Sequence, residues 1–525
     1  MIFSKIFEAL KKDYKFIVWY LILMTIVLLI ATTSSIGGDY TLHLPGKDVF
    51  ANITYIVTII AGLVYFLVFN KFESKNIKLE YLYLALVIPL GLMYCFANPI
   101  GMVPDEDQHA RRSLAISEGI FFAEKDDKGQ PVAMLNSKIN ELVTRNVKSY
   151  EDAINRITLA ETDEKISMNY SMATYAPICH MPQALGMFCA RLLGGGISIQ
   201  CYVARIVNML FAIYLMYLSI KLIPTKKHIV LFLGLLPLTI NEFASMSSDA
   251  LTISSCILYI AYICYLKYDE SKNSINKKDI VLLTILSICV SLLKIVYVPI
   301  CLLLLILPKE KFKTKKQKNL VVWMIIAFCM ILNIVWLIYA SGFLNEVNPG
   351  VNPAGQVKYI LTNPFEYCLI LFRTIHMYFQ TFILSLCGEG LGHYNVQSSV
   401  LFTIPCLILF TILFFVNEEK DKKVFELPIK ILSLIIFICV VLLIYTSLYV
   451  AWTVYESPVI LGVQARYFLP VLLLMAVVLE NNKIILNCKL KDKYLASFML
   501  FMNFNTLSCI TYTYIFEYII TYYIK

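Results

Sequence analysis

The strongest constraint on the fold of this chain is a series of apolar runs, each about as long as a membrane is thick. A helix needs roughly 20 apolar residues to cross the hydrocarbon core of a bilayer. Two shorter runs share residues 280–308 and are separated near Lys294. With these, we expect about thirteen transmembrane helices. The remaining runs cover residues 16–33, 53–70, 80–98, 199–223, 229–244, 251–266, 321–340, 401–416, 429–450, 467–479 and 494–515.

The composition excludes an ordinary soluble protein. Of the 525 residues, 59% are hydrophobic and only 15% are charged, and a mean hydropathy of +0.71 is typical of membrane proteins. The net charge of +9 does not indicate nucleic acid, because the lysines lie in short clusters between apolar runs. The sequence thus predicts an all-α polytopic membrane protein, whose partners include membrane lipids and no nucleic acid.

The placement of lysine indicates how the chain crosses the membrane. Cytoplasmic loops are rich in Lys and Arg, so the stretches "KKDYK", "PTKKH", "PKEKFKTKKQKN" and "NEEKDKK" should all lie on the inner side. This places the N-terminus in the cytoplasm. The runs 175–193 and 368–386 must then begin and end on the outer side, so we expect them to lie along the interface or to re-enter. The alternative is that our count of membrane spans is wrong, in which case the two runs need not both begin and end on the outer side.

A large first outer loop, residues 99–198, interrupts the apolar pattern. Acids and bases are mixed in its first part, and aromatic residues are few. The loop is too short and too polar to bury a large core by itself. We therefore expect two or three short helices, with interfacial helices among them, that pack on the membrane-embedded bundle.

The densest charge cluster, "PDEDQHARR" at residues 104–112, directly follows an apolar run. Its proline suits the first turn of a helix, where the helix dipole favours acids such as Asp105 and Glu106. On such a helix Asp105, His109 and Arg112 share one stripe, which suits a base and anion-binding groups acting on a membrane-bound phosphate. A capped interfacial helix with solvated ion pairs explains the same residues. We also consider a metal site of Asp105, Glu106 and His109. We favour a helix cap over it, because acids clustered at a helix start are more often caps.

Further candidate binding residues come from segments that the topology brings to the same face. Each has a structural alternative, namely a turn, a helix cap or a long side chain that snorkels to the interface. Jointly, basic groups that converge on one face favour a site for an anionic headgroup. No Walker loop, dinucleotide fingerprint, HExxH motif or nucleophile elbow is present. The further candidates are Tyr175, His180, Asp249, Lys294, Arg373, His376 and Arg466.

Several stretches occur in the order seen in a known family: "PDEDQHARRSLAISEG", "YAPICHMPQALGMFCARLLG", "ARIVNMLFAIYLMYLSIKLIP", "LLPLTINEFASMSSDAL", "LLKIVYVP" and "GVQARYFLP". They resemble bacterial multi-pass membrane proteins catalogued as domain of unknown function 2142, a family that looks like part of the GT-C glycosyltransferase superfamily. The resemblance covers residues 82–479. It implies a GT-C-like core at residues 80–525, with two transmembrane helices at residues 1–79 outside it.

This resemblance implies an enzyme of the bacterial plasma membrane that moves a sugar from a polyprenyl phosphate to an outer-face acceptor, such as a cell-wall or surface polysaccharide. Asp105 and Glu106 resemble the acidic pair of the first outer loop, with Asp105 as the base. Lys294 resembles a lysine that contacts the carrier phosphate, and Asp249 an acid of the second outer loop. No cofactor is implied beyond the lipid-linked donor. The sequence at Gln108 and His109 departs from the protein-mannosylating pattern, which leaves the acceptor class open.

Two other functional classes fit part of the pattern. A flippase or transporter of lipid-linked saccharides should carry polar residues at mid-span and related broken helices, whereas the charges here crowd one face. A glycan polymerase or ligase is also rich in outer arginines, but its large loop should come late in the chain. We therefore favour the transferase.

Overall fold

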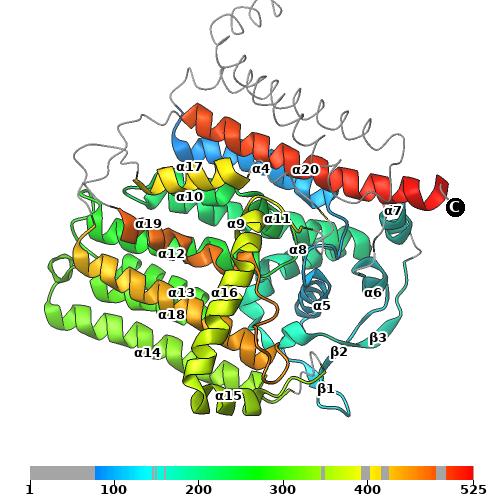
Figure 1. The fold of residues 1–525 in the computed structure, drawn as a ribbon, viewed down its shortest axis with the longest axis horizontal. Helices are drawn as coiled ribbons and strands as arrows, with labels where there is room; N and C mark the ends of the chain where they lie inside the picture. The colour runs from blue at the N-terminus through cyan, green and yellow to red at the C-terminus, as the bar shows by residue number, and fades with distance from the viewer. Residues whose placement is uncertain are drawn as a thin grey trace, which may run out of the picture.

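The computed structural model describes most of the chain after residue 76, and Figure 1 shows that this part is mostly helical. The predicted runs 16–33 and 53–70 lie outside the described residues. The described residues are 77–144, 147, 150–158, 161–343, 349–391, 396, 403–415, 425–480 and 492–523.

Six helices among the described residues are long and apolar enough to cross a membrane. Five of them coincide with predicted spans, and the sixth, α16, covers the run that we expected at the interface. The count of about thirteen spans therefore stays a prediction. The six are α4 (Leu79–Ala97), α9 (Ile197–Leu222), α12 (Asp249–Tyr268), α14 (Lys315–Ala340), α16 (Pro364–Leu386) and α18 (Leu427–Ala451).

Most of the remaining membrane-region elements are shorter or interrupted, whereas α20 (Asp492–Tyr523) is a continuous helix of 32 residues. The others are the helices α10 (Lys227–Leu235), α11 (Pro237–Phe243), α13 (Lys277–Leu293), α15 (Pro353–Thr362), α17 (Thr403–Phe415) and α19 (Leu472–Leu479), and the 3-10 helices η3 (Ile295–Ile306), η4 (Lys309–Lys311), η6 (Ala465–Tyr467) and η7 (Leu469–Val471).

Two predicted runs are broken by local backbone chemistry. The run 229–244 is not one span, because Pro237 has no amide hydrogen and holds Leu236 in an extended conformation (φ −60°, ψ 136°) between α10 and α11. The run 280–308 divides at Lys294, as predicted, with Lys294 itself extended (φ −153°) between α13 and η3. Each of the two runs therefore forms two helical elements.

The loop of residues 99–198, which we expect on the outer side, contains a small antiparallel sheet, which the all-α prediction missed. Its strands are β1 (Glu124–Lys125), β2 (Pro131–Asn136) and β3 (Lys165–Asn169), in the order β1-β2-β3, with Ala133 opposite Met168. The helical elements of the loop are α5 (Glu106–Ser117), α6 (Lys138–Leu142), α7 (Tyr150–Thr158), η1 (Ser171–Thr174), η2 (Pro177–His180) and α8 (Met181–Leu192).

The loop has a separate small core that is continuous with the bundle. Leu114, Leu135 and Ile139 of the loop cluster with Cys201 of α9. Helix α8 lies so close to α9 that a Cβ at Gly186 would sit 2.8 Å from the Cα of Ala204. The prediction that the loop packs on the membrane-embedded helices is therefore confirmed.

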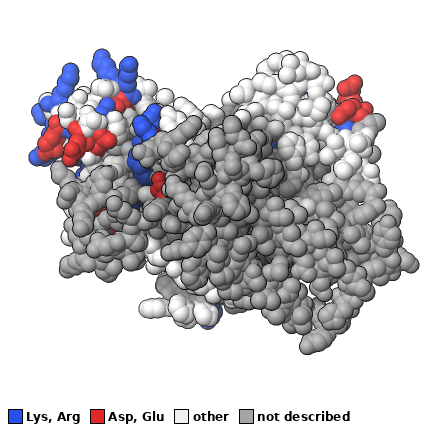
Figure 2. Space-filling model, turned by 90° about the horizontal axis from the view of Figure 1, so that it is seen from above, with Lys and Arg blue, Asp and Glu red and all other residues white. Residues whose placement is uncertain are grey.

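The directions of α12 and α13 show which charged residues lie at each end of the bundle. Helix α12 begins at Asp249 and has Lys267 in its last turn, while α13 begins at Lys277 and is followed by Lys294. The lysine-rich loops 269–278 and 308–318 consequently lie at the opposite end of these helices from Asp249 and Lys294. In Figure 2 most of the charged side chains in view gather at one end of the molecule, and a smaller acidic group lies toward the other end.

Helix α16 differs in direction from its neighbours. In Figure 1 it runs across the direction shared by α12, α13, α14 and α18. Its 23 residues satisfy the length for a span, and the expectation that it lies along the interface stays a prediction. Helix α8, with only 12 residues, is too short to cross.

Candidate functional site

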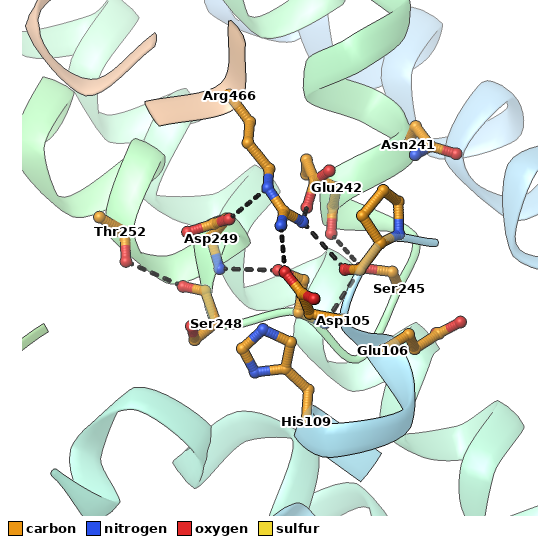
Figure 3. Close-up of polar contacts among 12 residues, drawn as sticks. Asp105, Glu106, His109, Asn241, Glu242, Ser245, Ser248, Asp249, Thr252 and Arg466 are labelled. Atoms are coloured by element: carbon orange, nitrogen blue, oxygen red, sulfur yellow. Dashed lines mark hydrogen bonds and ion pairs between the residues drawn. The ribbon is translucent and has the colours of Figure 1, made fainter. Parts of the chain in front are cut away.

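One guanidinium joins three acids from distant parts of the chain. Arg466 in η6 donates from Nη2 to the Asp105 carboxylate at 2.6 Å and from Nη1 to the Pro104 carbonyl at 2.9 Å. Its Nε lies 3.1 Å from Asp249 Oδ2, and its Nη1 lies 3.6 Å from Glu242 Oε2. Figure 3 shows Arg466 pointing down between these carboxylates. The structure thus brings Asp105, Asp249 and Arg466 together, as the sequence suggested.

Asp249 links Arg466 to a second cation. Its other oxygen, Oδ1, accepts a hydrogen bond from the Lys294 ammonium. Lys294 also lies over the rings of Tyr467, at 5.0 Å, and Tyr175, at 5.8 Å. Cations are attracted to aromatic faces in this geometry, so Lys294 is held by one acid and two rings. The result is a continuous chain of charges, Lys294–Asp249–Arg466–Asp105, which we call the ion-pair chain.

Asp105 is the most accessible of the three acids around Arg466. Its side chain is 27% exposed, against 4% for Asp249 and 1% for Glu242. Its backbone is left-handed (φ 63°, ψ 5°) at the residue that precedes α5, a conformation that Asp tolerates better than most residues and that often marks functional sites. Asp105 is therefore the acid of this group that is most open to the surroundings of the protein.

Glu106 has a different environment from its neighbour. It is fully buried and pairs with Arg205 of α9 through contacts of 2.6 and 2.8 Å. It also accepts from the backbone amides of Gly101, at 2.8 Å, and Met246, at 3.0 Å. Both of its oxygens are used inside the protein, so Glu106 fixes the start of α5 next to Asp105. A catalytic role for Glu106 stays a prediction.

The turn between Glu242 and Asp249 is fastened by buried polar side chains. Asn208 of α9 donates to the carbonyls of Ser245 and Ser247, and Gln183 of α8 donates to those of Met246 and Ser247. Buried amide side chains in such networks fix one backbone conformation. The position of Asp249 is consequently determined by α8 and α9 as well as by its own helix.

His109 and His180 form a buried pair beside the ion-pair chain. His109 Nδ1 lies 2.7 Å from His180 Nε2, and Figure 3 shows the His109 ring directed toward Asp105 and Asp249. Burial lowers the pKa of His109 to about 4 and holds the pKa of His180 well below its usual value. Both imidazoles are therefore neutral at pH 7, and one ring nitrogen donates to the other.

The Arg112 side chain contacts backbone carbonyls, and one of these belongs to Tyr175. Arg112 is buried, and its Nη2 donates to the carbonyls of Phe121, at 3.0 Å, and Tyr175, at 3.1 Å. Its guanidinium lies 5.9 Å from the ring centre of Tyr170. Burial raises the pKa of the Tyr175 phenol to about 12, so the ring stays uncharged. Arg112 thus secures the segment that carries Tyr175.

The structure does not bring Arg373 and His376 to the ion-pair chain. Both are exposed on α16, where Arg373 pairs with Glu366 at 2.9 Å. The helical spacing of these residues was the basis for including them, but the buried face of α16 carries Thr374 instead. The structure therefore does not group them with the ion-pair chain, and their role in binding stays a prediction.

Two cavities reach the ion-pair chain from different sides. The first, about 370 Å³, is bounded by Glu242, Arg466 and the aromatic residues Phe379 and Phe382 of α16. We call it the Arg466 cavity. The second, about 280 Å³, is the Lys294 cavity, bounded by Tyr175, Lys294, Tyr297, Trp336 and Tyr467. No described residue lines both.

The charges that face a ligand in these cavities come from side chains. Among the described residues, no group of three or more His, Cys, Asp or Glu side chains is placed to hold a metal ion. The cations at the site are the guanidinium of Arg466 and the ammonium of Lys294. These are the groups that could bind a phosphate.

Comparison with known sequences identifies the family of this chain. A family model described as "Predicted membrane protein (DUF2142)" matches residues 88–475, from α4 to α19. The chain belongs to the DUF2142 family. The match contains every residue of the ion-pair chain. No curated protein and no solved structure matches this DUF2142 sequence.

Three residues of this DUF2142 site were not singled out from the sequence. Arg205 is a lone arginine within an apolar helix, a signal that marks a buried partner or a functional group. Glu242 lies seven residues before Asp249 in the same stretch. Tyr467 follows Arg466 directly, and nothing in its local pattern distinguishes a ring that faces Lys294 from a core aromatic residue.

Proposed function

We propose that this chain is a membrane glycosyltransferase, which moves a sugar from a polyprenyl-phosphate donor to an acceptor at the outer face of a bacterial plasma membrane. The observation that carries this proposal is the partly exposed Asp105 carboxylate at the end of a chain of two cations, next to a cavity with aromatic walls. A base, a cation that binds the phosphate and an apolar cavity beside them are parts that this chemistry needs.

The reaction divides the work between the acid and one cation. The acceptor hydroxyl attacks the anomeric carbon and gives its proton to Asp105. The bond between that carbon and the phosphate oxygen breaks, and its electron pair leaves with the phosphate. Arg466, which lines the aromatic-walled cavity, stabilises the charge on this leaving group. Glu106 binds the Arg205 guanidinium and the Met246 amide, and so fixes the positions of Asp105 and of the turn before Asp249 relative to each other.

The test is the conversion of Asp105 to asparagine, which keeps size and tolerates the left-handed backbone. We expect Asp105→Asn to lower transfer by at least about 100-fold, the contribution of a general base. The assay measures release of polyprenyl phosphate from a panel of labelled polyprenyl-phosphate sugars by the purified protein in liposomes. Asp152→Asn is the matched control, since Asp152 lies in the same loop and pairs with Arg156 instead.

Two outcomes would count against the proposal. Undiminished transfer by a folded Asp105→Asn protein removes Asp105 from the role of base. Movement of the labelled headgroup across the liposome membrane without any covalent transfer favours the flippase alternative. Thermal unfolding of each variant in detergent establishes that the comparison is made between folded proteins.

A further inference from the structure

We propose that the Lys294 cavity receives a second lipid, so that the acceptor of the transfer, like its donor, approaches the site from within the bilayer. The acceptor is then a membrane-anchored molecule with an anionic headgroup that also carries a hydroxyl. This inference rests on the proposed function, and it names the class of the second substrate.

The first observation is that the two cavities meet the ion-pair chain at different points. Arg466 lines one and Lys294 lines the other. Asp249 stands between them, 3.1 Å from Arg466 Nε and hydrogen-bonded to Lys294. Two molecules can therefore occupy the cavities at once and place their headgroups against one short row of charges.

The second observation concerns the walls of the Lys294 cavity away from the charge. Ile295 and Leu337 both line it, and their side chains are 51% and 52% exposed. Leu337 belongs to α14, the candidate span whose window is only 22% buried within the protein. An apolar helix so little covered by protein faces lipid. The route to Lys294 along α14 therefore suits a hydrocarbon chain and disfavours a water-soluble saccharide.

The third observation concerns the headgroup. Lys294 has three N–H donors, and among the described residues the acceptor that it contacts is Asp249. The ammonium is held in the cavity wall between the rings of Tyr175 and Tyr467. A fixed ammonium at the inner end of an apolar cavity binds a phosphate or carboxylate rather than an uncharged headgroup.

The experiment uses the full chain in phosphatidylcholine nanodiscs, with tetradecyl phosphate that carries a diazirine close to its headgroup. After illumination, mass spectrometry measures labelling of the α14 segment 333–340 at the Lys294 cavity and of the α16 segment 375–385 at the Arg466 cavity. We expect both to be labelled. Lys294→Met should lower labelling of α14 by about tenfold and leave α16 unchanged, because one charge-assisted contact is lost.

Two further variants each fill one of the two cavities with a large side chain, so that the cavities are tested separately. Ser447 lines the Lys294 cavity, and Thr381 lines the Arg466 cavity. We expect Ser447→Trp to abolish labelling of α14 alone and Thr381→Trp to abolish labelling of α16 alone. A water-soluble diazirine-bearing glycerol phosphate should label neither segment.

The inference is overturned if α14 is labelled equally in the wild type, Lys294→Met and Ser447→Trp. It is also overturned if the soluble phosphate labels α14 as strongly as the lipid does. Transfer assays on the same preparations separate two failures. Lys294-dependent labelling without transfer removes the transferase and supports a lipid site, whereas transfer without labelling of α14 removes the lipid site alone.

Discussion

The buried pair of Glu106 and Arg205 offers the sharpest test of how the site is held. Both side chains have no exposed surface, and Glu106 also accepts from the amides of Gly101 and Met246. Arg205 donates to the carbonyls of Asn98, at 2.6 Å, and Pro99, at 3.0 Å. Removal of one partner leaves the other charge buried without compensation, which typically costs about 3–5 kcal/mol.

We therefore expect Glu106→Gln and Arg205→Met each to lower the free energy of unfolding by about 3–5 kcal/mol. The double variant should lose less than the sum by about 2 kcal/mol, since neither charge is then stranded. The assay is equilibrium unfolding by sodium dodecyl sulfate in mixed micelles, followed by circular dichroism, for the wild type, both single variants and the double variant.

The matched control is the ion pair of Lys165 and Glu118, which has the same 2.6 Å contact but a 49% exposed lysine. Its coupling should stay below about 1 kcal/mol. Additive losses for Glu106 and Arg205, or single losses as small as those of the control pair, would refute the assignment of Glu106 to a buried structural pair.

Two further predictions concern stability. The pKa of His109 is lowered by burial to about 4, so between pH 6.5 and 4 the unfolded chain binds more protons and the fold loses stability as the pH falls. His109 thus lowers the free energy of unfolding by about 2 kcal/mol between pH 7.5 and 5. The difference in unfolding free energy between these pH values should be smaller in His109→Gln than in the wild type. An equal difference in both proteins would contradict the lowered pKa of His109. Gly186→Ala should lower the free energy of unfolding by about 1–3 kcal/mol in the same assay, because the added Cβ meets the backbone of Ala204. The control is Cys189→Leu, at an exposed position of the same helix. Equal effects of the two substitutions would argue against a close contact between α8 and α9.

Apolar length predicted most of the membrane-region elements correctly, because it reports a local property. The boundaries of α9 and α18 lie within a few residues of the expected runs, and the break at Lys294 was also expected. Pro237 interrupts the run 229–244 by a local rule that window averages of hydropathy overlook. The sheet was missed because β2 and β3 are short, and β2 pairs with a strand about thirty residues away in the sequence.

The sequence predicted some members of the site but not its geometry. Charged residues beside or within apolar runs are costly, which is why Asp105, Asp249, Lys294 and Arg466 stood out. Their grouping depends on tertiary packing, as does the separate environment of Glu106, whose partner lies 99 residues away. Arg373 and His376 show the limit of helical spacing, which indicates that residues share a face but not which face is buried.

The contact between Asp105 and Arg466 also bears on how the protein is made. The two residues are 361 positions apart, and at ordinary rates of synthesis Arg466 follows Asp105 by on the order of 20 to 70 s. During that interval Asp249 already has Lys294 as a partner, 45 residues later in the chain, whereas Asp105 still lacks its guanidinium. Completion of the site thus waits for one of the later segments, and a chain that stalls before η6 leaves the Asp105 carboxylate without its Arg466 partner.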